Sequence, residues 1–353
     1  MMTIRKKYLI ESFVALVMSA AFVFTVLSCR NSTKTDNYAD DIQAMKQLLN
    51  SENLSDEARY GIIKKISTTL LSQKQHTQLI VYLTDWVETH PQDKFNAYWL
   101  LMVAHSYMQT NADPMAEFYF ERIIKNYPDL EVEGQSIHFL CLENLIKISR
   151  NSDSRIKYFN QLINRFPSSV SITEMYMRLA REYENIGEWT KALRTYNMFL
   201  EQPDAASIQI TDIPDAYNYA KTLIDFNSSP KDWTFRSLAS LETAIKEAIF
   251  RYQPNRLDAI RSKVNFFAVS WKQDENASTG QVDFSMANYM HGNRISYDKE
   301  LIPGPTPNEA YLRTTGWTTM PTWYFYLREV NFPADPDIHG RWEWAGIYIG
   351  DML

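Results

Sequence analysis

The side chains best suited to chemistry lie near the carboxyl end of the sequence, in two short polar runs. Asp335, Asp337 and His339 stand close together, and carboxylates and imidazoles are common metal ligands. Pro336 lies between them, which is typical of an ordinary turn, so we expect a turn without a metal ion. The run from His291 to Arg294 would suit a polar active loop, but a hairpin turn is the preferred interpretation.

The sequence contains no motif of an established catalytic class. A phosphate-binding loop, an HExxH zinc helix and a Gly-x-Ser-x-Gly nucleophile turn are all absent from it. No set of carboxylates stands out from the charged background. We therefore predict that the chain is not an enzyme and that it uses no cofactor.

The chain has only two cysteines, Cys29 and Cys141. Cys141 belongs to an apolar helical stripe from Phe139 to Ile146, and this position favours a buried, unreactive thiol. A single remaining cysteine also excludes a structural disulfide within the mature chain if Cys29 is modified.

The surroundings of Cys29 indicate an export signal. Basic residues at positions 5–7 precede an apolar run from Phe13 to Leu27, which has the length of a signal peptide and is short for a membrane span. The run ends in Val26–Leu27–Ser28–Cys29, which resembles the lipobox of bacterial lipoproteins. The resemblance implies cleavage before Cys29 and lipid on its sulfur and new amino terminus, so the chain would be held on a membrane. The alternative is an ordinary signal peptide or anchor helix in which Cys29 is incidental.

The residues after Cys29 and the overall charge limit the location and the partners. Residues 29–37 are polar and without apolar periodicity, so we expect a flexible tether. Arg30 stands where, in enteric bacteria, an aspartate retains lipoproteins on the inner membrane; the resemblance thus favours the outer membrane, with the protein facing the periplasm or the exterior. Removal of residues 1–28 takes away three positive charges and one negative charge and changes the net charge from −6 to −8. Such an acidic chain without a basic cluster is not expected to bind nucleic acid.

Prolines recur at a nearly constant spacing through the helical part of the sequence. Pro91, Pro128, Pro167 and Pro203 each follow a helical pattern and are separated by 37, 39 and 36 residues. Proline cannot continue a helix, so this recurrence predicts stacked helix pairs. Residues 38–50 carry one apolar stripe and predict a leading helix.

Two of these segments share a detailed pattern. In residues 176–203, Ala180 and Ala192 are small where two helices would touch, and Gly187 stands at the turn, where a positive φ costs little. Residues 100–128 repeat the pattern, with Asn111 in place of the glycine. Both segments resemble the tetratricopeptide repeat, a helix–turn–helix unit of about 34 residues. The pattern consists of Tyr176, Leu179, Ala180, Tyr183, Ala192, Tyr196, Phe199 and Pro203 in one segment, and Val103, Ala104, Tyr107, Ala116, Phe120, Ile123 and Pro128 occupy equivalent positions in the other.

Other helix pairs match by spacing and order alone. They cover residues 63–91 and 139–167, and a fifth pair is predicted over 215–226 and 233–252, ended by Pro254. Repeats of this family stack into a curved solenoid whose concave surface is lined mainly by first helices. The resemblance therefore implies a scaffold that binds a protein segment. The alternative is an irregular helical bundle without a groove.

The aligned repeats place seven side chains on the inner side of the first helices, where a groove would have its floor. His105 and Arg181 occupy equivalent positions in the two clear units, and a cationic floor would suit an acidic peptide or a carboxylate. The alternative is an ordinary solvated face. The seven residues are Lys64, Tyr98, His105, Asn144, Lys147, Arg181 and Asn185.

The pattern changes near residue 257. Segments rich in aromatic and β-branched residues alternate with turns, including one over 272–280, and predict a small antiparallel sheet or sandwich. The predicted strands are 264–271, 281–289, 294–297, 310–315, 322–330 and 342–349. Five of the nine tryptophans lie here, and we expect these rings mainly in the core; the alternative is an aromatic platform for a sugar or a peptide. They are Trp271, Trp317, Trp323, Trp342 and Trp344.

The sequence thus predicts a mainly α-helical chain with four parts. These are a signal peptide over 1–28, a tether over 29–37, a tetratricopeptide-like solenoid over 38–256 and a β-rich domain over 257–353. The predicted function is a membrane-anchored, non-catalytic scaffold that binds a protein partner in envelope assembly or transport. The alternative is a receptor that binds a glycan or a small molecule through its aromatic-rich domain.

Overall fold

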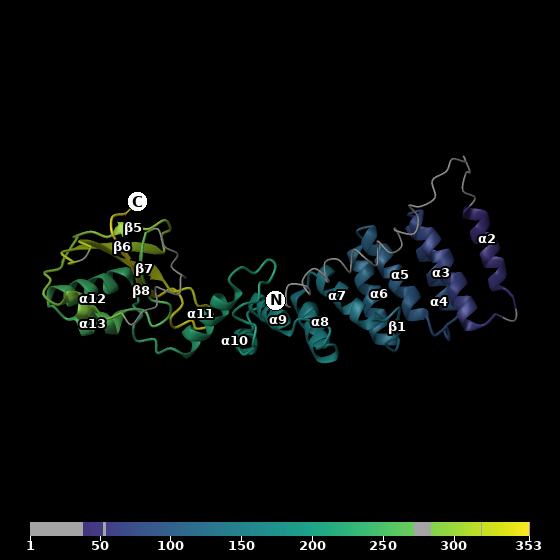
Figure 1. The fold of residues 1–353 in the computed structure, drawn as a ribbon, viewed down its shortest axis with the longest axis horizontal. Coiled ribbons are helices and arrows are strands. Elements are labelled where there is room, and N and C mark those ends of the chain that lie inside the picture. The colour runs from purple at the N-terminus through teal and green to yellow at the C-terminus, as the bar shows by residue number, and fades with distance from the viewer. Residues whose placement is uncertain (1–37, 52–53, 272–283, 319, 353) are drawn as a thin grey trace, which may run out of the picture. The chain divides into compact units, whose positions relative to one another are not determined.

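The computed structural model describes residues 38–51, 54–271, 284–318 and 320–352. The signal peptide, Cys29, the tether and the turn predicted over 272–280 lie outside these residues. The described chain is helix-rich with a sheet in its carboxy-terminal part, as predicted (Figure 1). It divides into two compact units, one ending at Phe95 and one beginning at Asn96, which we describe separately. No described helix has the length and apolar character needed to span a membrane.

The first unit consists of helices. The leading helix predicted over 38–50 is confirmed as α2, and the pair predicted over 63–91 is present as two consecutive helices. Ser55 caps the first of these, because its hydroxyl accepts the backbone N–H of Ala58 at 3.2 Å. Apolar side chains of the pair, such as Ile66 and Leu83, are fully buried. The helices are α2 (Tyr38–Leu49), α3 (Asp56–Ser72) and α4 (His76–Thr89).

The second unit begins with helices that pack one upon the next in sequence order, from α5 to α11 (Figure 1). Each of the recurring prolines in this unit follows shortly after the end of a helix, as predicted: Pro128 after α6, Pro167 after α8 and Pro203 after α10. A short hairpin joins α6 to α7. The elements are α5 (Asn96–Gln109), α6 (Asp113–Asn126), β1 (Glu131–Val132), β2 (Gln135–Ser136), α7 (Ile137–Ile148), α8 (Ser152–Arg165), α9 (Ile172–Asn185), α10 (Trp189–Leu200) and α11 (Ala216–Ser228).

The turns and contacts inside the two clear helix pairs agree with the residue types. Asn111 and Gly187, between the helices of their pairs, have positive φ angles of 58° and 75°. Ala180 and Ala192 are fully buried between α9 and α10, as are Ala104 and Ala116 between α5 and α6. The absence of a larger side chain at these positions allows the paired helices to approach closely.

The sheet of the second unit is mixed. Its strand order is β3-β8-β7-β6-β4, with β5 also paired to β6. β3 runs parallel to β8, and the other pairs are antiparallel. The strands predicted over 310–315, 322–330 and 342–349 are confirmed. The strands are β3 (Phe267–Ser270), β4 (Ser296–Tyr297), β5 (Ile302–Pro303), β6 (Glu309–Thr315), β7 (Thr322–Glu329) and β8 (Trp342–Ile349).

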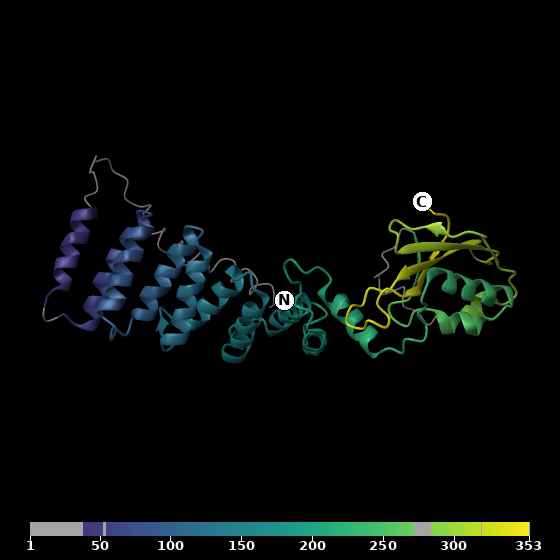
Figure 2. The same cartoon turned by 180° about the vertical axis from the view of Figure 1, so that it is seen from behind.

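Three helices cover one face of this sheet, namely α12 (Leu238–Phe250), α13 (Pro254–Ile260) and α14 (Met286–Met290). Figures 1 and 2 show α12 and α13 beside the sheet. Their apolar side chains share a core with alternate residues of β6, β7 and β8. Trp344 lies at its centre, fully buried and stacked on Phe325 with a ring-centroid distance of 4.4 Å. The opposite face carries a second cluster that is rich in tyrosine.

The fifth helix pair, its end at Pro254 and one strand differ from the prediction. The predicted fifth helix pair is not a packed pair: α12 turns its apolar side to the sheet, while α11 packs with α9 and α10. Pro254 does not end α12 but begins α13. The strand predicted over 281–289 is wrong for residues 286–289, which belong to α14 (Met286–Met290). The helix begins there because the Asp258 carboxylate accepts the Met286 N–H at 3.0 Å and the Ser285 hydroxyl at 3.2 Å. These long-range bonds stabilise the start of a helix that the local pattern does not favour.

The connection between β7 and β8 leaves the sheet and joins the core of the helices. Val330, Phe332 and Ile338 are buried in the same cluster as the apolar side chains of α9, α10 and α11. Phe332 stacks on Phe226 of α11 at a centroid distance of 5.5 Å. The last helix of the α5–α11 series is thus covered by a loop of the sheet.

Candidate functional site

The seven residues predicted for a groove lie on α3, α5, α7 and α9, which are the first helices of the first four of the five predicted pairs. Lys64 belongs to the first unit, where its ammonium lies 5.6 Å from the centroid of the Tyr60 ring. The other six belong to the second unit. They are Tyr98 and His105 on α5, Asn144 and Lys147 on α7, and Arg181 and Asn185 on α9.

His105 does not supply the positive charge that the sequence suggested. Its ring is half-buried and packs edge-on against Phe120 of α6 at a centroid distance of 5.6 Å. Burial, together with the nearby positive charge of Lys147, lowers the pKa of His105 to about 4. The imidazole is therefore neutral at pH 7. His105 and Lys147 lie near one another, but of the two only Lys147 contributes a positive charge.

This burial predicts acid sensitivity. The folded pKa of about 4 lies below the ordinary 6.5, so the unfolded chain binds more protons between these values, and stability falls as the pH falls from 6.5 towards 4. Denaturant unfolding should show a loss of about 2 kcal/mol in the free energy of unfolding between about pH 7.5 and about pH 5. His105→Gln should remove this part of the pH dependence, whereas His291→Gln, at an exposed position, should not. An unchanged pH profile in His105→Gln would refute the assignment.

The α7 residues of the predicted floor are partly engaged within their own helix. The Asn144 side chain donates a hydrogen bond to the Leu140 carbonyl at 2.7 Å. Burial raises the pKa of Glu143, and the neighbouring Lys147 opposes this rise. Lys147 itself is exposed, so it keeps its charge accessible to a partner.

Arg181 belongs to a polar cluster between α9, α10 and α11. Its guanidinium lies 5.2 Å from the centroid of the Tyr219 ring. The Tyr219 hydroxyl donates to the Glu184 carboxylate at 2.5 Å, and the fully buried Tyr196 donates to the same carboxylate. Burial, together with the bond to Glu184 and the negative charge of that carboxylate, raises the pKa of Tyr219 to about 12. Asn185, one turn beyond Arg181, is exposed.

Cys141 is buried, as predicted. Burial raises the pKa of its thiol well above the ordinary value, with Asp129 adding to the rise. The thiolate, which is the reactive form, is therefore suppressed at neutral pH.

The two polar runs near the carboxyl end form turns. Asp335 accepts the backbone N–H of Asp337 at 3.0 Å, and Nδ1 of His339 accepts the backbone N–H of Phe332 at 3.2 Å. Among the described residues, no three or more His, Cys, Asp and Glu side chains gather in a way that could hold a metal ion. The run at 291–294 follows α14 and contains Gly292 with a φ of 75°, so it links a helix to β4 and is not a hairpin.

The tryptophans of the carboxy-terminal region belong mainly to the core. Trp317, Trp323 and Trp344 are buried, and Trp317 stacks on Trp323 at 4.1 Å; Trp271 and Trp342 are half-buried. The expectation of a tryptophan-rich core is thus confirmed for these side chains. Among the described residues of the sheet and its helices, the exposed large aromatic rings are Phe250 (81% exposed), Tyr252 (48%) and Tyr289 (44%).

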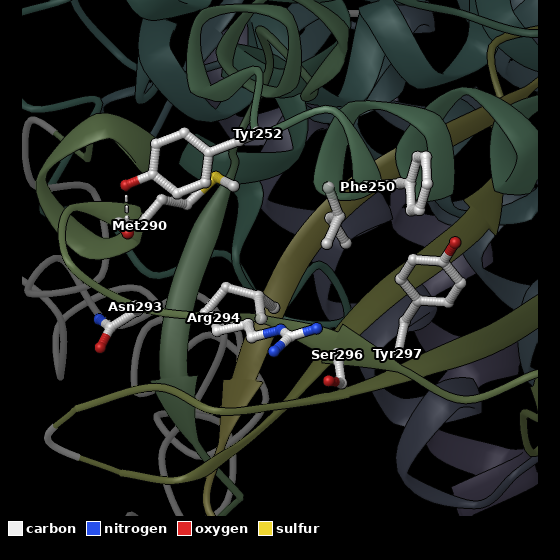
Figure 3. A pocket seen from close by; sticks show the side chains of 9 residues that line it. Phe250, Tyr252, Met290, Asn293, Arg294, Ser296 and Tyr297 are labelled. Atoms are coloured by element: carbon white, nitrogen blue, oxygen red, sulfur yellow. Dashed lines mark hydrogen bonds between the residues drawn. The ribbon is translucent and has the colours of Figure 1, made fainter.

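Two of these exposed rings border an open cleft of about 450 Å³ between the end of α12 and the segment that leads into β4 (Figure 3). Arg294 lies at the cleft, and the Tyr252 hydroxyl donates to the Met290 carbonyl at 2.6 Å across one end of it (Figure 3). The sequence singled out Arg294 only as part of a turn. The lining residues are Ile249, Phe250, Tyr252, Met290, Asn293, Arg294, Ile295, Ser296 and Tyr297.

No protein-family model matches the chain, and no curated protein sequence matches it.

Proposed function

We propose that the chain is a lipid-anchored, non-catalytic scaffold of the bacterial cell envelope, which binds a protein partner through tetratricopeptide-like helix pairs. The observation that carries the proposal is an internal repeat in which sequence and geometry agree. Ala104 and Ala180, buried in α5 and α9, are separated by the same distance along the chain as the left-handed turn residues Asn111 and Gly187. Helix pairs that repeat in this way stack into extended binding surfaces.

The partner would contact the first helices of the pairs in the second unit. With His105 neutral, the cations on these helices at the predicted floor are Lys147 and Arg181. Lys147 is exposed, whereas the Arg181 guanidinium rests on Tyr219. An acidic segment of the partner therefore suits Lys147 best, because an exposed charge guides recognition without first losing an internal contact.

Lipidation of Cys29 would hold this scaffold close to partners in or on the membrane. Metabolic labelling with an alkyne fatty acid should mark the wild-type chain, and Cys29→Ala should abolish the label and release the protein from the membrane fraction. Cys141→Ala is the matched control and should retain the label, because Cys141 is buried. A labelled Cys29→Ala chain would contradict the anchor.

The scaffold is tested by crosslinking in intact cells, followed by affinity purification from detergent-solubilised envelopes. We expect one protein to be recovered in near-stoichiometric amount and to be lost with Lys147→Glu, since a reversed charge would repel an acidic partner. Lys125→Glu, at an exposed position near the end of the second helix α6, is the control and should retain it. Failure to recover any such protein, even after crosslinking, would count against the scaffold.

The receptor for a glycan or a small molecule is the second candidate, and the cleft near Arg294 favours it. Phe250 is the most exposed large apolar side chain among those described, and exposed rings offer flat apolar area to a ligand. Calorimetric titration with glycans would support the receptor if Phe250→Ser removed the binding heat. The receptor and the scaffold are compatible functions, because the cleft and the predicted groove floor on α5, α7 and α9 consist of different residues.

A further inference from the structure

The cleft at the end of α12 combines an exposed cation with exposed aromatic surface. Arg294 is exposed and is the only charged residue among the described residues that line the cleft. Phe250 and Tyr252 stand on the opposite side, at the carboxyl end of α12 (Figure 3). A guanidinium beside apolar rings binds a group that carries a carboxylate next to an apolar moiety, since it pairs with carboxylate in a planar, bidentate manner.

The guanidinium of Arg294 is available for such a ligand. In the part of the chain that the structure describes, it makes no ion pair or hydrogen bond. Carboxylates on the surrounding elements are instead paired with other cations, which leaves Arg294 without a neutralising neighbour among them. These pairs are Glu242 with Lys246 at 2.6 Å, Glu247 with Arg256 at 3.3 Å, and Asp298 with Arg313 at 3.5 Å.

The cleft also borders an edge strand. β4 is the outer strand beyond β6 in the described sheet, and Tyr297 of β4 lines the cleft. The N–H of Asp298 donates to the Arg313 carbonyl at 3.0 Å, and Ser296 pairs with Thr315 on the other side of Tyr297. Backbone groups alternate in direction along an antiparallel pair, so the N–H and C=O of Tyr297 point away from β6. An outward-facing strand edge accepts an extended peptide by strand addition.

We propose that this cleft is a separate binding site for an extended peptide segment that carries a carboxylate beside an apolar side chain. The peptide backbone pairs with Tyr297, its carboxylate binds Arg294, and its apolar side chain packs on Phe250 and Tyr252. The site goes beyond the scaffold function, because it uses none of the α5, α7 and α9 residues. A neutral glycan offers no carboxylate to the guanidinium, so at this cleft the charge of Arg294 favours the peptide over the neutral glycan of the second candidate function.

The test uses the full mature chain and two blocked, fluorescein-labelled hexapeptides. Both alternate valine and phenylalanine; one carries a single central glutamate, and the other carries glutamine in its place. Fluorescence anisotropy should show about tenfold tighter binding of the glutamate peptide. Arg294→Gln should remove that preference, and Phe250→Ser should weaken both peptides about fivefold. Circular dichroism establishes that each variant is folded.

Matched controls stand elsewhere on the same unit. Arg150→Gln, at an exposed position between α7 and α8, and Phe118→Ser, 55% exposed on α6, should leave both affinities unchanged. The proposal is overturned if neither peptide binds, or if folded Arg294→Gln keeps the preference for glutamate. It is also overturned if chitohexaose binds in a Phe250-dependent manner while the peptides do not, which would support the glycan receptor. Loss of an envelope partner in Lys147→Glu concerns the helix pairs alone and leaves this test intact.

Discussion

Replacing Gly346 with alanine is expected to destabilise the second unit by about 3 kcal/mol. A Cβ atom at this position of β8 would lie 2.6 Å from Cζ of Phe267 and 2.7 Å from two other carbons of its ring. Phe267, on the neighbouring strand β3, is only 2% exposed and packs among Tyr326 and Tyr348, so its ring has little room to move. Glycine at 346 is therefore needed for the close approach of an aromatic ring to the strand backbone.

The free energy of unfolding in urea measures this effect. Gly346→Ala combined with Phe267→Leu should cost less than the sum of the single changes, because the smaller side chain leaves space for the new methyl group. Gly61→Ala is the control: no atom lies within 4 Å of its added Cβ, and Gly61 is inside α3. That substitution should stabilise its helix by up to about 1 kcal/mol. Equal effects at 346 and 61 would contradict the steric explanation.

Removal of the Arg155 guanidinium is the second change with a large expected effect. Arg155 of α8 pairs with Glu182 of α9 at 2.8 Å, and the Glu182 side chain is only 6% exposed. Arg155→Met leaves a buried carboxylate without its cation, and we expect the free energy of unfolding to fall by about 2–3 kcal/mol. This loss is smaller than that expected for a wholly buried pair, because the Arg155 side chain is 33% exposed. The pair connects successive helix pairs, so its loss should also loosen their packing.

The double variant Arg155→Met/Glu182→Leu distinguishes two effects: the loss of the ion pair itself and the burial of an unpaired Glu182 carboxylate. It should regain most of the stability that the single variant loses, since an apolar side chain does not need a buried counter-charge. Lys191→Met is the control: Lys191 pairs with Glu188 at 3.2 Å on the surface, and its loss should change stability by less than about 0.5 kcal/mol. A double variant as unstable as Arg155→Met would contradict the role assigned to Glu182.

The parts of the fold that local pattern dictates could be predicted from the sequence. The strands at 310–315 and 342–349 are rich in β-branched and aromatic residues, a local signal for a strand. The small residues and the turn residue that define the α9–α10 pair likewise lie close together within one repeat. The start of α14 depends on hydrogen bonds to Asp258, which lies nearly thirty residues earlier in the sequence. No local sequence pattern contains that contact. The packing of α12 on the sheet is equally non-local, because its apolar stripe would fit a neighbouring helix as well.

The candidate sites were predictable to different degrees. Alignment of the repeats was sufficient to place Asn144, Lys147 and Arg181 on first helices. It could not give the charge of His105, which depends on burial against Phe120 and on repulsion from Lys147. The cleft at Arg294 was missed because α12 and β4, which are distant in the sequence, meet only in the folded unit. A phenylalanine at the last position of α12 was a local feature that could have indicated it.

The loop from Val330 to Ile338 has a consequence for how such a chain can change its length over evolution. A series of stacked helices leaves an apolar surface at each end, which must be closed before the array is soluble. At the carboxyl end this closure is made by Phe332 on Phe226 of α11, within one shared core. A helix pair inserted after α11 would separate the loop from the surface of α11 on which it packs. Duplication of an internal pair would leave the contact between the loop and α11 intact. The array is therefore open to growth only upstream of its last helix.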